Sequence, residues 1–209
     1  MRHRYWLSLC LLTALAAGCD KPRPAEPAGN EAAPVAPAPA PPIGKDGEAG
    51  YLDREYAGKS APSDSFKDPD GESVTLAEFR GKPLLLNLWA TWCGPCIIEM
   101  PTLDALAKRE GGRIKVVALS QDLDGAAKVD AFFKKNDLPN LDAYLDDQGA
   151  LGSALGVTTL PTTIFYDAEG KELWRIVGGQ DWTGAKAASL LKEADAVPPK
   201  PPTNPSAAR

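Results

Sequence analysis

The segment from Leu84 to Ala90 is nearly continuous in apolar residues and is interrupted only by Asn87. Such a run is typical of a strand that is buried on both faces of a parallel sheet. The stretch from Arg113 to Ser120 carries a similar run and predicts a second core strand. Residues 141–145 predict a third. We expect the first of these strands to lie at the centre of the sheet.

Apolar residues at helical spacing predict helices between and after these strands. Gly111-Gly112 predicts the end of the first helix, and residues 149–155 predict a short one. The faces of the other helices are marked, in chain order, by Met100, Leu103, Leu106 and Ala107, by Val129, Phe132 and Phe133, and by Leu190, Leu191 and Ala194.

Two hairpins complete the predicted elements. A Pro-Asp-Gly turn at 69–71 lies within the segment Phe66–Leu76 and predicts an entry hairpin, and residues 162–167 and 173–177 flank a second turn. The alternation of strands and helices predicts an α/β fold, with a mixed central sheet covered by helices on both faces.

The two ends of the chain differ in composition from this middle part. Pro, Ala and small polar residues dominate 19–50 and 198–209, and few large apolar residues accompany them. Such segments bury too little surface to offset the entropy lost on ordering, so we expect both to be disordered. One compact domain is predicted over 51–197.

Residues 1–18 are predicted to be a processing signal, because Arg2 and Arg4 precede an apolar run that is too short for an ordinary membrane span. The tetrad Ala16-Ala17-Gly18-Cys19 resembles a bacterial lipobox, which implies cleavage before Cys19 and lipidation of that residue. Plain secretory cleavage, leaving Cys19 as a thiol, is the alternative. Asp20 resembles the residue that retains enterobacterial lipoproteins in the inner membrane. The resemblance implies a lipid anchor on the periplasmic side of that membrane.

Cysteine and histidine usage narrows the chemistry. Cys93 and Cys96 are the thiols left once the signal is removed and Cys19 is blocked, too few for a disulfide framework or a tetrahedral zinc site. The one histidine, His3, lies in the signal, which excludes a Cys-His dyad from the mature protein. The net charge of −5 argues against nucleic-acid binding. We predict no metal and no cofactor beyond a redox-active Cys93–Cys96 disulfide.

The pair itself lies in Trp92-Cys93-Gly94-Pro95-Cys96, directly after the predicted central strand and at the start of the first long helix. Peptide N–H groups and the helix dipole there favour the thiolate, the nucleophilic form of cysteine. We therefore predict that Cys93 attacks a substrate disulfide. Cys96, one helical turn later, would resolve the mixed disulfide.

The stretch from Leu88 to Cys96 resembles the active site of the thioredoxin superfamily. Glu99-Met100-Pro101, Asn87 and the lipoprotein leader narrow this resemblance to the TlpA/ResA group of extracytoplasmic thioredoxin-like proteins. It covers about Gly58 to Ala196 and implies a thioredoxin fold with an extra helix and strand, which we assign to Asp124–Asp146. The implied activity is thiol–disulfide exchange.

The resemblance also implies substrate-binding residues. Pro161 matches the cis-proline that faces the disulfide, and Leu160 before it would offer backbone groups to a substrate strand. Gly178 matches a glycine that lets substrate approach, and Trp92 and Pro95 line the same groove. Each has a structural alternative: Pro161 as a trans turn proline, Gly178 as a turn glycine and Trp92 as a packing residue.

Asn87 replaces the buried aspartate of plain thioredoxin, and an amide cannot exchange a proton at neutral pH. Glu99 is the nearest carboxylate in sequence. It resembles the glutamate near the dithiol of the TlpA/ResA group, which implies that it accepts the proton of the resolving thiol. Burial would raise its pKa and suit it to that task. The alternative is an exposed helix residue.

The dipeptide Gly94-Pro95 matches that of thioredoxin, whose potential of about −270 mV is reducing. Reduction of disulfides in client proteins is therefore expected, with clients of the apocytochrome c or copper-chaperone type. The resemblance implies recharging by a membrane thiol donor of the DsbD/CcdA type. Two other functions stay open: a thiol peroxidase of related fold, and a chaperone that binds Cu(I) through both thiolates.

Overall fold

A computed structural model describes residues 50–193 of the chain. The predicted signal 1–18, Cys19, the tether apart from Gly50, Ala194 and the tail 198–209 lie outside the described residues.

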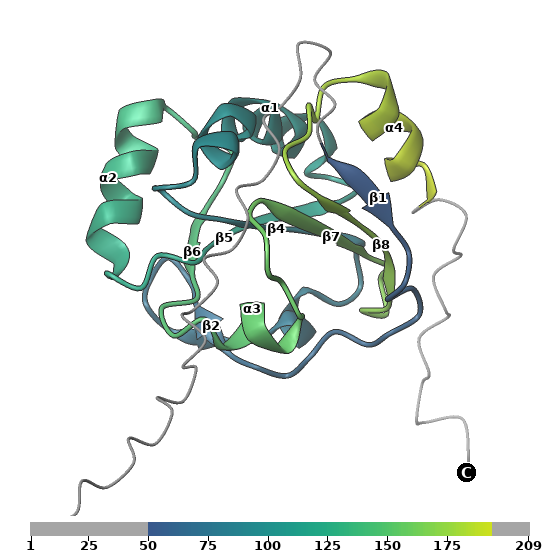
Figure 1. Cartoon of the computed structure of the whole chain (residues 1–209), viewed down its shortest axis with the longest axis horizontal. Helices are drawn as coiled ribbons and strands as arrows, with labels where there is room; N and C mark the ends of the chain where they lie inside the picture. The colour runs from purple at the N-terminus through teal and green to yellow at the C-terminus, as the bar shows by residue number, and fades with distance from the viewer. Residues whose placement is uncertain (1–49, 194–209) are drawn as a thin grey trace, which may run out of the picture. The chain divides into compact units, whose positions relative to one another are not determined.

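Eight strands form one mixed sheet in the order β1-β8-β7-β4-β5-β6-β2-β3 (Figure 1). β4 lies inside it, parallel to β5 and antiparallel to β7. The strands are β1 Tyr51–Asp53, β2 Phe66–Lys67, β3 Ser73–Val74, β4 Leu84–Trp89, β5 Lys115–Ser120, β6 Ala143–Leu145, β7 Thr162–Tyr166 and β8 Glu172–Val177.

Helices cover both faces of the sheet. α1, α2 and α4 lie on one face and α3 on the other (Figure 1). The helices are α1 Gly94–Glu110, α2 Ala126–Asn136, α3 Ala150–Ala154 and α4 Ala185–Leu191, and a short 3-10 helix, η1, spans Leu76–Phe79. The order of elements from β4 onward is the predicted one.

The side chains of β4 divide between two hydrophobic clusters because successive residues of a strand point to opposite faces. Leu85 and Trp89 belong to the cluster under α1, α2 and α4, whereas Leu86 and Leu88 belong to the cluster beneath η1 and α3. Every residue of β4 is buried, as predicted. Asn87 therefore lies on the α1 face, between Leu85 and Trp89.

The entry hairpin and the α–β insertion are also confirmed. β2 pairs with β3, and the predicted insertion Asp124–Asp146 contains α2 and β6. One prediction was wrong: Leu76 does not extend the hairpin but begins η1. A capping box explains this, because the Thr75 backbone N–H donates to Glu78 Oε1 at 2.7 Å and so starts a helical turn. β1, which pairs with β8, was not predicted from the sequence.

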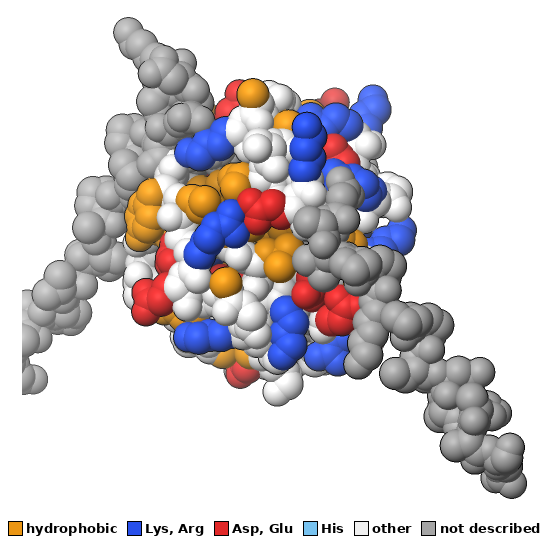
Figure 2. Space-filling view, turned by 90° about the vertical axis from the view of Figure 1, so that its right-hand side faces the viewer, with side chains coloured by type: hydrophobic (Ala, Val, Ile, Leu, Met, Phe, Trp, Pro, Cys, Tyr) orange, Lys and Arg blue, Asp and Glu red, His pale blue; other side chains and the backbone are white. Residues whose placement is uncertain are grey.

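The face that carries β1 and α4 presents apolar side chains among charged side chains of both signs (Figure 2). Neither sign of charge dominates this view.

Candidate active site

Four chain segments meet at one edge of the sheet. β4, β5 and β8 run in one direction and β7 in the other, so the carboxyl ends of the first three lie at the same edge as the amino end of β7. The Trp92–Cys96 motif follows β4, Asp122 follows β5, Pro161 precedes β7 and Gly178 follows β8. Carboxyl ends of parallel strands are the usual location of functional sites in α/β folds.

Cys93 and Cys96 form a disulfide at the start of α1, with an S–S distance of 2.09 Å and a Cα–Cα distance of 5.3 Å. Cys93 is the N-cap, and its Sγ accepts a hydrogen bond from the Cys96 backbone N–H at 3.3 Å. Both sulfurs can therefore exchange electrons as a pair. Cys93 is 6% exposed and Cys96 0% exposed, so the first cysteine is the more accessible one.

Exposed apolar side chains flank the disulfide in sequence. Large exposed hydrophobic residues are few in the described part of the chain, yet Trp92, Ile97 and Ile98 all lie in or beside the motif. Leu123 is a further exposed large hydrophobic residue. It follows Asp122, which is hydrogen-bonded to Thr91, the residue just before the Trp92–Cys96 motif. Trp92 is 69% exposed, which contradicts its interpretation as a packing residue. An exposed apolar surface beside a reactive disulfide can bind the apolar side chains of a polypeptide.

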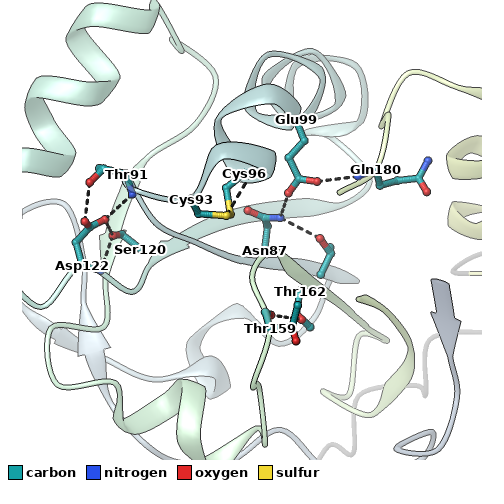
Figure 3. The surroundings of a disulfide bond; sticks show 11 residues. Asn87, Thr91, Cys93, Cys96, Glu99, Ser120, Asp122, Thr159, Thr162 and Gln180 are labelled. Carbon is teal, nitrogen blue, oxygen red and sulfur yellow. Dashed lines mark hydrogen bonds between the residues drawn. A yellow bond between two sulfur atoms is a disulfide. The ribbon is translucent and has the colours of Figure 1, made fainter. Parts of the chain in front are cut away.

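Glu99 lies on α1, one helical turn after Cys96, and is 1% exposed, so its interpretation as an exposed helix residue was wrong. Its Oε1 accepts from Asn87 Nδ2 at 2.6 Å and its Oε2 from the Gln180 backbone N–H at 2.9 Å (Figure 3). Burial raises the pKa of Glu99 from 4.5 to about 8, although both hydrogen bonds oppose that shift. Glu99 can therefore gain or lose a proton near neutral pH.

Asp122 holds the segment before the motif in place and was not predicted. Its carboxylate accepts from the Thr91 backbone N–H at 2.9 Å, from Thr91 Oγ1 at 2.6 Å and from Ser120 Oγ at 2.7 Å (Figure 3). The side chain is 1% exposed. The sequence signal for Asp122 was its place just after a predicted core strand, next to the strand that precedes the motif.

The Leu160–Pro161 peptide bond is cis, as the resemblance implies, so the trans alternative was wrong. Gly178 has φ 102°, a conformation that favours glycine, and its N–H donates to the Pro161 carbonyl at 2.8 Å. These two predicted residues thus lie together, while Leu160 and Pro95 are half-buried. Their contacts with substrate stay predictions.

Within residues 50–193, no three His, Cys, Asp or Glu side chains cluster in a way that could hold a metal ion. Cys93 and Cys96, when reduced, are the pair in this site that could bind a soft ion.

Comparison with known proteins agrees with this geometry. The Redoxin family model matches residues 56–192. The thiol-disulfide oxidoreductase ResA of Bacillus cereus is 36% identical over 135 residues, which cover 63% of this chain and 77% of ResA. The thiol:disulfide interchange protein DsbE of Pseudomonas fluorescens is 34% identical over 150 residues, covering 68% of this chain and 82% of DsbE.

A solved structure is similar as well. The pneumococcal exposed lipoprotein thioredoxin Etrx1 of Streptococcus pneumoniae superposes with a TM-score of 0.55 at 26% identity, covering 65% of this chain and all of Etrx1. The fold is thus thioredoxin-like, with the dithiol pair where such enzymes act. The chain belongs to the Redoxin family and is a thiol–disulfide oxidoreductase of the ResA and DsbE type.

Proposed function

We propose that the chain reduces disulfides of client proteins outside the cytoplasm, with Cys93 as the attacking sulfur and Cys96 as the resolving one. The observation that supports this assignment most is the position of Cys93 as the N-cap of α1. There its Sγ already accepts a backbone N–H, and a thiolate would gain from the same donor and from the helix dipole.

The reaction then proceeds in two exchanges. The Cys93 thiolate attacks one client sulfur, forms a mixed disulfide and releases the other client sulfur as a thiolate that takes a proton. Cys96 loses its proton and attacks Cys93 Sγ. The Cys93–Cys96 bond forms, the bond to the client breaks and the second client thiol leaves. Two electrons pass from the enzyme to the client.

Glu99 is proposed to accept the proton that Cys96 loses. Its place one helical turn after Cys96, its burial and its raised pKa of about 8 support this role. A carboxyl group with an ordinary pKa would be a weaker base for a thiol.

The exposed residues beside the disulfide support a polypeptide client. Trp92 would contact client side chains, and Pro95, Leu160, Pro161 and Gly178 would line the path of the client backbone. Resemblance supports clients of the apocytochrome c or copper-chaperone type. Recharging would come from a membrane dithiol donor of the DsbD/CcdA type.

A lipid anchor on Cys19 would hold the enzyme at the periplasmic side of the inner membrane. The lipobox-like sequence supports this, and the related Etrx1 is named a lipoprotein. In the described part of the chain, 50–193, we find no helix with the length and apolar character needed to cross a bilayer. Incorporation of labelled palmitate that disappears in Cys19→Ala tests the anchor.

Insulin-disulfide reduction tests the activity. Cys93→Ser and Cys96→Ser should each abolish catalytic turnover, while Cys19→Ser, outside the proposed site, should not. Turnover of peroxide without insulin reduction would instead favour the peroxidase. Tight Cu(I) retention without reductase activity would favour the chaperone.

A further inference from the structure

Asn87 has a buried oxygen without a partner. The residue is 0% exposed, and its Nδ2 donates to Glu99 Oε1 at 2.6 Å and to Thr163 Oγ1 at 2.9 Å. Its Oδ1 has no hydrogen-bond partner. A buried polar atom left unsatisfied is costly, and native structures rarely keep one without a reason.

The direction of this oxygen suggests the reason. In Figure 3 the amide of Asn87 lies between the Cys93–Cys96 sulfurs and Glu99, with nitrogen toward Glu99 and oxygen toward the sulfurs. Both N–H groups of Nδ2 have acceptors on the far side. A half-turn of the amide would take Nδ2 away from Glu99 Oε1 and Thr163 Oγ1, so the observed orientation is the one that keeps both of its hydrogen bonds.

A disulfide sulfur carries no hydrogen, whereas a thiol does. We propose that Oδ1 of Asn87 accepts a hydrogen bond from the Cys96 S–H in the dithiol form, which makes Asn87 a positioning residue that favours the reduced enzyme. Cys96 is 0% exposed, so water is excluded as the usual acceptor for this thiol. Oδ1 of Asn87 is an acceptor that has no hydrogen-bond partner until the Cys93–Cys96 disulfide is reduced.

The bond forms in a balanced step. A donor dithiol passes two electrons and two protons to the Cys93–Cys96 disulfide, whose S–S bond breaks while the donor's own disulfide forms. One of the protons stays on Cys96 Sγ and faces Oδ1. Because the bond exists only in the dithiol, it shifts the equilibrium toward that form. It also holds the proton on Cys96, since a hydrogen bond to the neutral form disfavours ionisation.

Asn87 can influence Cys96 by a second route, because it also holds Glu99. The hydrogen-bond partners of this amide are Glu99 on α1 and Thr163 on β7, and the Gln180 backbone N–H after β8 donates to the same Glu99 carboxyl group. Among these three, Glu99 is the one that titrates. An experiment must therefore separate a direct effect of Oδ1 on Cys96 from an effect transmitted through Glu99.

The test uses the full chain carrying Cys10→Ser and Cys19→Ser, so that Cys93 and Cys96 are its thiols. The disulfide–dithiol equilibrium is measured against glutathione for this protein and for Asn87→Leu, then again with Glu99→Gln in both. We expect Asn87→Leu to shift the equilibrium toward the disulfide about fivefold in both backgrounds. Thr163→Val, which keeps Oδ1, should change it less than about twofold. A shift that vanishes in the Glu99→Gln background would overturn the proposal.

Infrared spectroscopy supplies a second readout that loss of packing would not mimic. With Cys93→Ser added, Cys96 is the remaining thiol, and its S–H stretch should lie below that of an unbonded thiol. Asn87→Leu should move the band up. If Asn87→Leu does not fold, the band of the Asn87-containing protein decides alone, and a position typical of an unbonded thiol would contradict the inference.

Discussion

Glu99 and Asp122 are both buried carboxyl groups and lie on either side of the disulfide (Figure 3), but their surroundings differ. Asp122 accepts three hydrogen bonds, two from Thr91 and one from Ser120. Glu99 accepts two, one from Asn87 Nδ2 and one from the Gln180 backbone N–H. Burial outweighs the hydrogen bonds at Glu99 and raises the pKa of its carboxyl group to about 8, so Glu99 can carry a proton near neutral pH. We infer that Asp122 positions the motif and that Glu99 handles a proton.

The largest expected effect that separates the two is the pH dependence of stability. The pKa of Glu99 is about 8 in the folded chain against 4.5 without the fold, so the folded state holds a proton that the unfolded state releases between these values. Stability should therefore fall by about 4 kcal/mol as pH rises from about 4.5 to 8, and Glu99→Gln should remove most of that slope. Urea unfolding of the oxidised protein at several pH values measures it. Equal slopes for both proteins would refute the assignment.

The next effect concerns the resolving step. If Glu99 takes the proton of Cys96, Glu99→Gln should slow the release of client from the mixed disulfide about hundredfold. Rapid-quench measurement of the mixed disulfide follows this rate. Glu110→Gln provides a matched control, because Glu110 lies at the other end of α1 in a surface ion pair with Arg113. A normal rate in Glu99→Gln would remove Glu99 from the mechanism.

Asp122→Asn should destabilise the protein by about 1–3 kcal/mol, because the new amide cannot accept all three hydrogen bonds. Thermal or urea unfolding measures it, and the exposed Asp124→Asn serves as control. A protein of unchanged stability would show that the Thr91 contacts are incidental.

The smallest expected effect lies on the outer side of the disulfide. Trp92→Ala should raise the KM for a polypeptide client about threefold to tenfold and leave kcat nearly unchanged, because it removes exposed apolar contact rather than chemistry. Leu52→Ala, an exposed apolar position on β1, should leave both constants unchanged. A kcat loss in Trp92→Ala would mean that Trp92 also orders the motif.

Local patterns predicted the elements that have a clear periodicity. The run at 84–90 and the helical spacing after Cys96 each depend on nearby residues, and both elements are confirmed. β1 was missed because it is three residues long, and its pairing with β8 joins residues more than a hundred positions apart. Short strands whose stability depends on a distant partner carry little local signal.

In the active site, too, features defined by neighbouring residues were predicted and contacts between distant segments were not. The CxxC pair was found because its chemistry is contained in five consecutive residues. The contact between Asn87 and Glu99 was not predicted, since it depends on how α1 crosses β4 and not on either residue's neighbours. Asp122 and Gln180 likewise reach the site through strand order, which the sequence pattern leaves open.

Trapping of the mixed disulfide distinguishes the attacking sulfur from the resolving sulfur, which we assign to Cys93 and Cys96. Reduced Cys96→Ser and Cys93→Ser proteins are each mixed with a disulfide-bonded client, and covalent adducts are counted by non-reducing electrophoresis and mass spectrometry. We expect a stable adduct through Cys93 in Cys96→Ser and hardly any adduct in Cys93→Ser. An adduct that forms as readily through Cys96 would contradict this assignment.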